Sequence, residues 1–130
     1  MKLDTRAGLE ARCLPLGALM TNCYVLIAGG ECWVADPGIS PGRLLEVLAE
    51  KELVPSRILL THGHADHIGG VEAVQRAHPG ARLTCPAGDA AMLSDPNANM
   101  SAPFGFPLTA PAPDQQVHPG DALTQGPLTW

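Results

Sequence analysis

Hydrophobic residues in the first third of the chain form short runs between glycine, proline and charged positions. These runs predict strands over residues 11–16, 22–28 and 31–35. Gly29 and Gly30 separate the last two runs, and adjacent glycines readily adopt the positive φ angles that a two-residue hairpin turn requires. The sequence therefore predicts a β-hairpin here, preceded by one further strand.

The next hydrophobic positions have helical spacing. Ser40 and Pro41 predict a helix start, with Ser40 as the N-cap and Pro41 as the first helical residue. The predicted apolar face consists of Leu44, Leu45, Val47 and Leu48. We expect the helix to end before Val54-Pro55, because proline lacks the backbone donor that a helix interior needs.

Residues 57–93 continue with an alternation of strand and helix. We expect a strand ending at Leu60, then a polar loop, then a second helix. The apolar face of that helix is predicted to consist of Val71, Val74 and Ala77. Residues 82–85 resemble a further strand and residues 88–93 a short helix. This alternation is typical of helices packed on a sheet.

Residues 95–119 lack this pattern and are rich in proline, asparagine and alanine, with Phe104 and Phe106 on either side of a glycine. A loop of this length in a compact domain is usually functional or mobile. One interpretation is a flap over an active site, with Phe104 or Phe106 touching substrate. The interpretation that the sequence favours is an ordered connection held by two buried aromatic side chains.

The polar loop after Leu60 contains four candidate metal ligands within six residues: His62, His64, Asp66 and His67. Alternate side chains of extended backbone point the same way, so His62 and His64 could bind one ion together. Imidazole suits zinc, iron and copper, and a carboxylate adds a harder oxygen donor. Asp66 and His67 are adjacent and could serve a second ion if the chain turns there. The loop therefore predicts a metal site.

The segment Thr61–Gly70, with the sequence THGHADHIGG, resembles the signature of the metallo-β-lactamase superfamily in its glyoxalase II-like (hydroxyacylglutathione hydrolase-like) branch. A second match lies upstream, where residues 20–26 (MTNCYVL) and 34–38 (VADPG) resemble the opening strands of the same hydrolases. The resemblance implies an α/β fold, the αββα metallo-β-lactamase sandwich. Residues 1–130 would form the N-terminal part of a single domain, truncated before its second half.

The resemblance also implies roles for the candidate ligands. In that family, the residues matching His62 and His64 bind a first metal ion, and those matching Asp66 and His67 bind a second. Two zinc ions per complete site are expected, with iron or manganese as alternatives. The Asp-Pro-Gly turn that begins at Asp36 lies beneath the metal site in the family. Asp36 could therefore orient a histidine ligand from behind, although its spacing fits a plain turn equally well.

The chain also departs from the family pattern. Relatives complete the first metal site with a histidine in a segment resembling His-Thr-Pro-Gly-His. They bridge the metals with an aspartate and complete the second site with a distant histidine. None of these segments follows His67 in this sequence. His78 and His118 remain, but each precedes a proline outside any such motif, and we expect both to be solvated.

The last residues predict a second hairpin. Residues 121–124 and 128–130 read as two short strands around a turn at residues 125–127. In the family, such a hairpin leads into the strand that carries the third histidine. We therefore expect the chain to be the N-terminal part of a longer protein. The alternative is a short protein that pairs its unfinished sheet with another chain.

Composition narrows the range of partners. The 130 residues are 45% hydrophobic and 16% charged, which fits one packed domain rather than a disordered chain. The net charge of −5 and the lack of a basic stripe argue against nucleic-acid binding. Residues 1–6 lack the apolar core of a signal peptide, and no run approaches transmembrane length. We expect a cytoplasmic protein without membrane contact; the pattern specifies no oligomeric state.

The four cysteines are scattered and include no Cys-x-x-Cys pair: Cys13, Cys23, Cys32 and Cys85. Cys23 and Cys32 could face each other across the predicted hairpin, but the lack of an export signal favours reduced thiols. We expect all four to be small core residues.

The predicted reaction follows from the metal site. Two metals would lower the pKa of a bound water toward neutrality, generating a hydroxide. The hydroxide would attack a thioester or another acyl carbonyl. The resemblance implies a thioester such as a hydroxyacylglutathione, so the expected partner is a small-molecule thioester. Asp66 is the candidate catalytic residue, because it would hold the second metal and orient the water.

Two other interpretations stay open. An iron-dependent persulfide dioxygenase shares the fold and much of the motif. A truncated, non-catalytic fragment would hold metal only weakly, because affinity depends on a completed ligand set. A β-lactamase is less expected, since no export signal is present.

Overall fold

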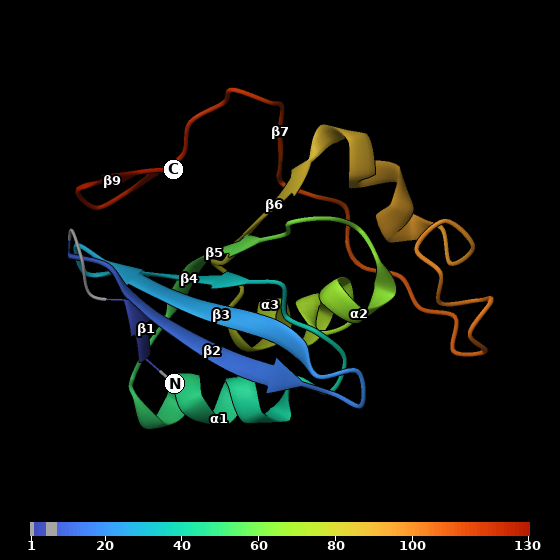
Figure 1. Ribbon diagram of the computed structural model, residues 1–130, viewed down its shortest axis with the longest axis horizontal. Coiled ribbons are helices and arrows are strands. Elements are labelled where there is room, and N and C mark those ends of the chain that lie inside the picture. The colour runs from blue at the N-terminus through green and yellow to red at the C-terminus, as the bar shows by residue number, and fades with distance from the viewer. Residues whose placement is uncertain (1, 5–7) are drawn as a thin grey trace.

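The computed structural model describes residues 2–4 and 8–130 and contains one seven-stranded sheet (Figure 1). Residues 1 and 5–7, part of the segment searched for an export signal, lie outside the described residues. The strands are β1 (Lys2–Asp4), β2 (Glu10–Leu16), β3 (Thr21–Ala28), β4 (Glu31–Ala35), β5 (Pro55–Leu59), β6 (Arg82–Pro86) and β7 (Gln115–Val117). They lie side by side in chain order, antiparallel from β1 to β4 and parallel from β4 to β7.

The predicted strands are confirmed, with β1 and β7 added at the two edges of the sheet. The hairpin between β3 and β4 turns at Gly29 and Gly30, whose φ angles are 56° and 80°. The register pairs Ile27 with Cys32 and Leu14 with Cys23. Cys23 and Cys32 are therefore not partners across the hairpin, which corrects that expectation.

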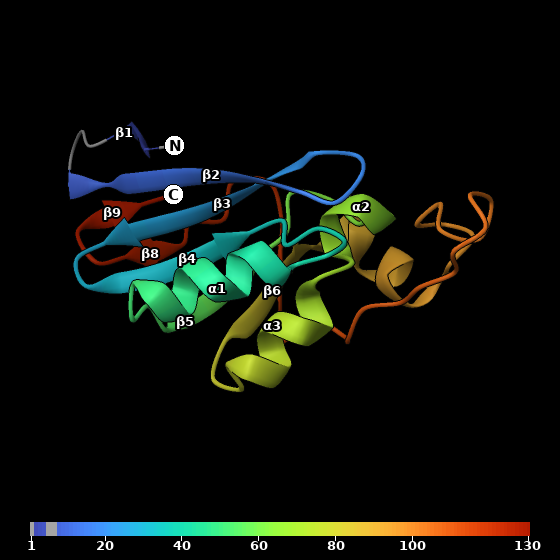
Figure 2. The ribbon, with the colours of Figure 1, turned by 90° about the horizontal axis from the view of Figure 1, so that it is seen from below.

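Helices α1 (Gly42–Glu50) and α3 (Val71–Ala77) pack on one face of the sheet, as Figure 2 shows from the helix side. The short helix α2 (Ala65–Ile68) and the 3-10 helix η2 (Ala87–Ser94) lie at one end of the strands. This arrangement confirms the predicted α/β architecture, in which the parallel strands β4, β5 and β6 are each followed by a helical segment.

The start of α1 differs from the prediction by one residue. An N-cap residue normally has extended backbone, whereas Ser40 has a φ of 61° and makes no capping hydrogen bond. Pro41 is the N-cap instead, and its carbonyl accepts the Leu45 backbone N–H at 3.0 Å. The predicted apolar face of α1 is confirmed, but Ala77, in the last turn of α3, is exposed rather than buried.

Alternate residues of the central strands enter two different hydrophobic clusters. The cluster beneath the helices includes Val25, Val34, Leu44, Leu48, Ile58, Leu60, Val71 and Leu83. The cluster on the opposite face contains Ala11, Leu26, Trp33 and Ala35. Side chains that alternate along a strand point to opposite faces, so both faces of this sheet are buried.

A second hairpin covers part of the face opposite the helices. Strands β8 (Thr124–Gln125) and β9 (Leu128–Thr129) confirm the predicted hairpin, and in Figure 1 they lie on the other side of the sheet from α1. The Trp33 and Trp130 rings lie 6.4 Å apart. The buried Gln125 side chain donates to the Leu26 carbonyl at 2.9 Å. The molecule therefore has a helix layer, a sheet and a β-hairpin on the opposite face.

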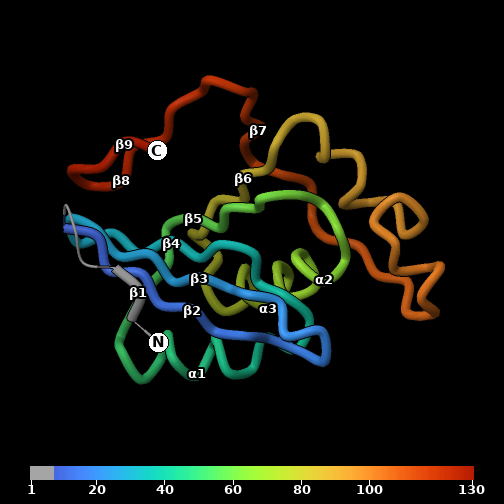
Figure 3. Tube along the Cα trace, viewed as in Figure 1, coloured from blue at the N-terminus to red at the C-terminus, as the bar shows by residue number. Residues whose placement is uncertain are grey.

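The aromatic residues of the long loop are not where the favoured prediction placed them. Phe104 is 71% exposed and Phe106 is 40% exposed, so this loop is not held by buried aromatic side chains. Asn99 and Ser101, both fully buried, form its interior instead. Figure 3 shows this segment, in orange, extending from the sheet at the same end as α2.

Two further findings concern the cysteines and the length of the helices. Cys23, Cys32 and Cys85 are buried as expected, whereas Cys13 is only half-buried, and all four are free thiols. Over the described part of the chain, no helix is long and apolar enough to cross a membrane.

Candidate metal centre

Three neighbouring parallel strands deliver the candidate site to one edge of the sheet. Asp36 follows β4, residues 61–64 follow β5, and Asp89 lies in η2 directly after β6. The carboxyl ends of parallel strands meet at the same edge, and loops that leave this edge commonly carry ligand-binding residues. The order of strands in the sheet thus brings together residues that are far apart in the sequence.

The candidate ligands of the histidine-rich loop lie close together. The ring centroids of His62 and His67 are 4.1 Å apart, and those of His62 and His64 are 4.8 Å apart. One donor atom from each of His62, His67 and Asp36 lies within 4.8 Å of the others. His64 is the most exposed of the three histidines. The loop therefore gathers imidazole nitrogens and carboxylate oxygens in one place.

Asp36 occupies the base of this group and is almost completely buried. Its Oδ1 accepts the Thr61 backbone N–H at 2.8 Å, and its Oδ2 accepts the Thr61 hydroxyl at 2.6 Å. The same Oδ2 lies 2.9 Å from Nδ1 of His67. The Asp36 backbone has a φ of 51°, which non-glycine residues rarely adopt outside turns and functional sites. With these partners, Asp36 is placed to orient other residues rather than to act as a ligand itself.

The contact with Asp36 determines which nitrogen of His67 is available. A carboxylate can only accept, so Nδ1 of His67 carries the proton and donates it to Asp36. The other nitrogen, Nε2, is the one left to bind a metal, and it lies 3.4 Å from Oδ2 of Asp66. Histidine ligands of metals commonly donate their second nitrogen to a carboxylate in this way. Asp36 therefore orients the His67 ring so that Nε2 faces Asp66 and the candidate donor group.

The Asp66 carboxylate is oriented by a residue that lies 45 positions away in the sequence. The Thr21 hydroxyl, at the start of β3, donates to Oδ2 of Asp66 at 3.1 Å. Because residues 65–68 form a helical turn, the adjacent Asp66 and His67 side chains do not diverge as they would in a strand. From the sequence, we expected Asp66 and His67 to act together only if the chain turned at these residues. The helical turn at residues 65–68 meets this condition.

Backbone groups of the histidine-rich loop (residues 61–67, the ligand loop below) are bound by residues that the sequence analysis did not identify. Asp89 accepts the Gly63 N–H through its carboxylate at 2.9 Å, and the Asn99 carbonyl accepts the Ala65 N–H at 2.8 Å. Neither residue lies in a recognisable motif. The only signal for Asp89 is its position just after a predicted strand, and Asn99 has none that local sequence could provide.

Close backbone packing fixes the loop from the other side. A Cβ atom on Gly38 would lie 2.6 Å from the Asp66 carbonyl, and one on Gly70 would lie 2.5 Å from the Gly38 carbonyl. The Gly70 N–H donates to the Pro37 carbonyl at 2.8 Å. The Asp-Pro-Gly turn and the start of α3 are therefore in direct contact, and only glycine fits between them.

The donor set fits a divalent metal of the zinc or iron type. Three imidazoles and one carboxylate within a six-residue segment match the ligands that such ions prefer. The other two histidines lie outside this segment. His78 is the C-cap residue of α3, and Nδ1 of the largely exposed His118 lies 3.6 Å from Oδ2 of Asp121. Among the described residues, neither joins the donor group.

Comparisons with known proteins show the family of this chain. A family model described as Metallo-beta-lactamase superfamily matches residues 16–130. The probable metallo-hydrolase YqgX of Bacillus subtilis is 32% identical over 121 residues, which cover 92% of this chain and 57% of that protein. A hydroxyacylglutathione hydrolase of Anaeromyxobacter dehalogenans is 41% identical over 109 residues, covering 82% of this chain and 41% of the relative.

Solved structures show the same fold. The BLEG-1 B3 metallo-beta-lactamase superimposes with a TM-score of 0.85 and 34% identity, covering 92% of this chain and 58% of that one. TTHA1623 in a di-iron-bound form superimposes with a TM-score of 0.75 and 28% identity, covering 86% of this chain and 56% of that one. The chain thus spans about half the length of the relatives that it matches.

Proposed function

The chain belongs to the metallo-β-lactamase superfamily, and we propose that the full-length protein is a metal-dependent hydrolase that cleaves a thioester such as a hydroxyacylglutathione. The observation that carries this proposal is the convergence of donor atoms of His62, His67 and Asp36 within 4.8 Å of one another. Asp66 lies beside them, with Oδ2 3.4 Å from Nε2 of His67, and Asp36 holds Nδ1 of the same imidazole. The thioester class is supported by the 41% identity to a hydroxyacylglutathione hydrolase.

In this proposal, the metal-binding residues are His62, His64, Asp66 and His67. Bound metal would lower the pKa of water toward neutrality and polarise the carbonyl under attack. Asp36 keeps Nδ1 of His67 protonated and so leaves Nε2 as the donor. Thr21 fixes the orientation of the Asp66 carboxylate, which would hold a metal and position the attacking water.

We propose zinc as the metal, with two ions per complete site. Imidazole and carboxylate donors suit zinc, but they also suit iron, and the relative TTHA1623 has a di-iron-bound form. The remaining ligands of a complete site would come from outside the donor group described above. We further propose a small-molecule partner in the cytoplasm rather than nucleic acid or membrane, in keeping with the net charge of −5.

The test is elemental analysis and thioesterase assay of the purified full-length protein. We expect about two metal ions per chain and turnover of hydroxyacylglutathione, with both lost in His62→Ala and Asp66→Ala variants. His118→Ala is the matched control, because this histidine is largely exposed and outside the donor group. Retained turnover in the His62 or Asp66 variants would refute the assignment. One iron per chain with oxygen consumption on a persulfide would instead favour the dioxygenase.

A second candidate is a β-lactamase, because the BLEG-1 structure shares 34% identity and a TM-score of 0.85 with this chain. The same preparation can be assayed with a chromogenic cephalosporin. Cephalosporin hydrolysis without thioester hydrolysis would replace the proposed function with this one.

A further inference from the structure

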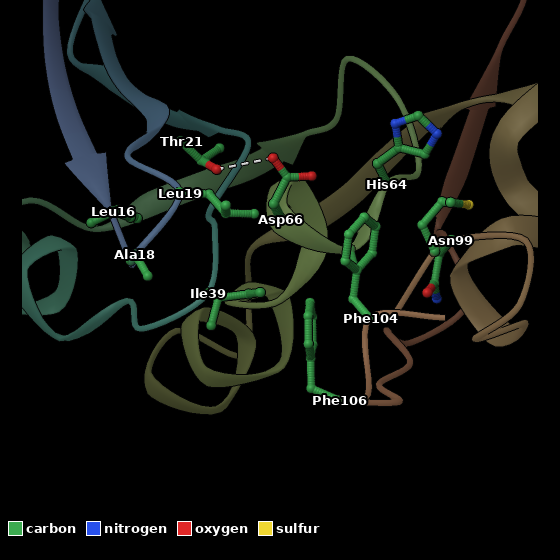
Figure 4. Close-up of a pocket in the computed structure, with 13 residues that line it drawn as sticks. Leu16, Ala18, Leu19, Thr21, Ile39, His64, Asp66, Asn99, Phe104 and Phe106 are labelled. Atoms are coloured by element: carbon green, nitrogen blue, oxygen red, sulfur yellow. Dashed lines mark hydrogen bonds between the residues drawn. The ribbon is translucent and has the colours of Figure 1, made fainter. Parts of the chain in front are cut away.

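A cleft of about 730 Å³ opens beside the candidate metal centre. Two loops form its walls: the tight turn at residues 17–20 between β2 and β3, and the segment 99–106 of the long loop. His64 and Asp66 lie on its surface (Figure 4). A molecule in this cleft would therefore have one end at the candidate metal ligands and the rest between the two loops.

The walls of the cleft are apolar and reach into solvent. Leu19 is 68% exposed at the tip of one loop, while Met100, Phe104 and Phe106 are 41%, 71% and 40% exposed on the other. The two phenyl rings lie 6.5 Å apart. Figure 4 shows Leu19 and the two phenylalanines projecting from different segments beside Asp66. Large hydrophobic side chains gathered in this way around one cleft mark a binding surface.

The loop that carries the phenylalanines is held in place without burying them. The Asn99 amide donates to the carbonyls of Met92 and Leu108 at 3.1 and 3.0 Å, and its oxygen accepts from the Ser101 hydroxyl at 2.6 Å. The Phe106 N–H donates to the Ser101 carbonyl at 3.1 Å. Buried polar residues thus order the loop, so the exposed rings are not needed for its core.

Apart from metal at its inner end, the cleft offers no basic side chain to a charged substrate group within the part of the chain that the structure describes. Among the described residues that line it, none is lysine or arginine, and the ionisable side chains are those of His64 and Asp66. The carboxylates of a peptide-like thiol would lose hydration here without gaining an ion pair, which is unfavourable. A hydrocarbon group would instead be removed from water on several sides.

We propose that this cleft binds an extended hydrocarbon group attached next to the scissile carbonyl of a thioester. Leu19 on one loop and Phe104 and Phe106 on the other form the cleft beside His64 and Asp66. This inference rests on the proposed function for the reaction, and the cleft adds the substrate class. Charged parts of the substrate would lie outside the cleft. The hydrocarbon group can belong to the acyl part or to the thiol part, and the experiment separates these sources.

The test uses the metal-loaded full-length protein and two thioester series. One series lengthens the acyl chain on a constant thiol, from acetyl through hexanoyl to decanoyl; the other lengthens an alkyl thiol on a constant acetyl group. Each buried methylene contributes about 0.8 kcal/mol, or about fourfold in binding. With partial burial, we expect kcat/KM to rise at least tenfold along one series, and that series identifies the source.

Variants connect this rise to the cleft. A Phe104→Ser, Phe106→Ser double variant should reduce the ratio of long-chain to short-chain kcat/KM about tenfold, because the exposed hydrocarbon contacts are removed. The Phe104→Leu, Phe106→Leu variant should recover most of the ratio. Val54→Ala is the matched control, since Val54 is 72% exposed but does not line the cleft. A flat response in both series, or a ratio unchanged in the serine variant, overturns the inference.

A binding measurement separates this inference from the proposed reaction. The probe is a decyl thioether that cannot be hydrolysed, titrated into the parent protein and the serine variant by calorimetry. Binding that weakens about tenfold in the variant, without hydrolysis of any thioester, would support the apolar cleft and refute the reaction. Hydrolysis of thioesters with no binding of the thioether would support the reaction and refute the cleft.

Discussion

Oδ2 of Asp36 lies 2.9 Å from Nδ1 of His67, although the two residues are 31 positions apart in the chain. The contact joins the end of β4 to the helical turn that follows β5, and Thr61 completes the same hydrogen-bonded group. The orientation of a candidate metal ligand thus depends on a neighbouring strand of the sheet. This dependence gives the first of five predictions.

Replacing Asp36 by asparagine should weaken metal binding. Asparagine tolerates the positive φ of this position, so the backbone is retained while the negative charge that accepts the His67 proton is lost. We expect a loss of about 10- to 100-fold in metal affinity, the range found when such supporting residues are replaced. Competition with a chromogenic chelator measures it in the full-length protein. The exposed Asp121→Asn serves as control, and equal affinities in both variants would leave Asp36 as a turn residue only.

Replacing Gly70 by alanine should destabilise the fold at the ligand loop. The new Cβ would meet the backbone carbonyls of Gly38 and Pro37 at 2.5 and 2.9 Å, so backbone must move. We expect the free energy of unfolding to fall by about 1–3 kcal/mol, measured by urea denaturation. Gly42→Ala is the matched control, because nothing lies within 4 Å of its added Cβ, and helix propensity should raise stability by up to about 1 kcal/mol. A neutral Gly70→Ala would show that the two turns can separate freely.

Replacing Asn99 by alanine should loosen the long loop. The Met92 and Leu108 carbonyls and the Ser101 hydroxyl would lose a partner in a buried setting, and each unsatisfied buried group costs about 1–3 kcal/mol. We expect faster hydrogen exchange of the Phe106 and Ala65 amides and a lower melting temperature. Asn97→Ala, an exposed asparagine of the same loop, should change neither quantity. Unaltered exchange in the Asn99 variant would contradict the role of this side chain.

The buried thiols should react slowly with alkylating reagents. Burial raises the pKa of both Cys32 and Cys85 from 9.0 to about 11, and that of Cys23 in the same direction. At pH 8 these residues remain thiols, and only thiolates are nucleophilic. We expect iodoacetamide to modify the half-buried Cys13 first in the folded chain and all four after denaturation, as read by mass spectrometry. Early modification of Cys85 would argue against a closed core.

The same shifts predict the direction of an alkaline effect on stability. The folded chain keeps Cys32 and Cys85 protonated up to about pH 11, whereas the unfolded chain ionises them near pH 9.0. The unfolded state therefore loses protons first as the pH rises, and stability should be fully present below pH 9 and fall between pH 9 and 11. Replacing both residues by alanine should flatten this part of the melting curve against pH.

Features that depend on neighbouring residues could be predicted from the sequence. The hairpin at Gly29-Gly30 requires only two adjacent residues with positive φ, and the strands and helices around it follow from short apolar runs. The cluster of histidines is equally local, because its members lie within six residues. These parts of the prediction did not require knowledge of long-range contacts.

Features set by distant contacts could not be predicted in this way. Ser40 has the residue type of an N-cap, but its backbone is in the left-handed region, next to the packed turn at Gly38. Phe104 and Phe106 are exposed because buried Asn99 and Ser101 order their loop, a combination that reverses the usual preference of these residue types. Asp89 and Asn99 reach the ligand loop only through the order of strands in the sheet.

Among the described residues, Asp36, the histidine-rich loop and Asp89 follow the carboxyl ends of β4, β5 and β6. The turns at the opposite edge, including exposed Val54 and the unobstructed Gly80, contain none of them. Exposed loop tips of this kind tolerate insertions best. A label or surface anchor placed at these turns would immobilise the molecule with its cleft open to solution, which makes this edge suitable for biosensor construction.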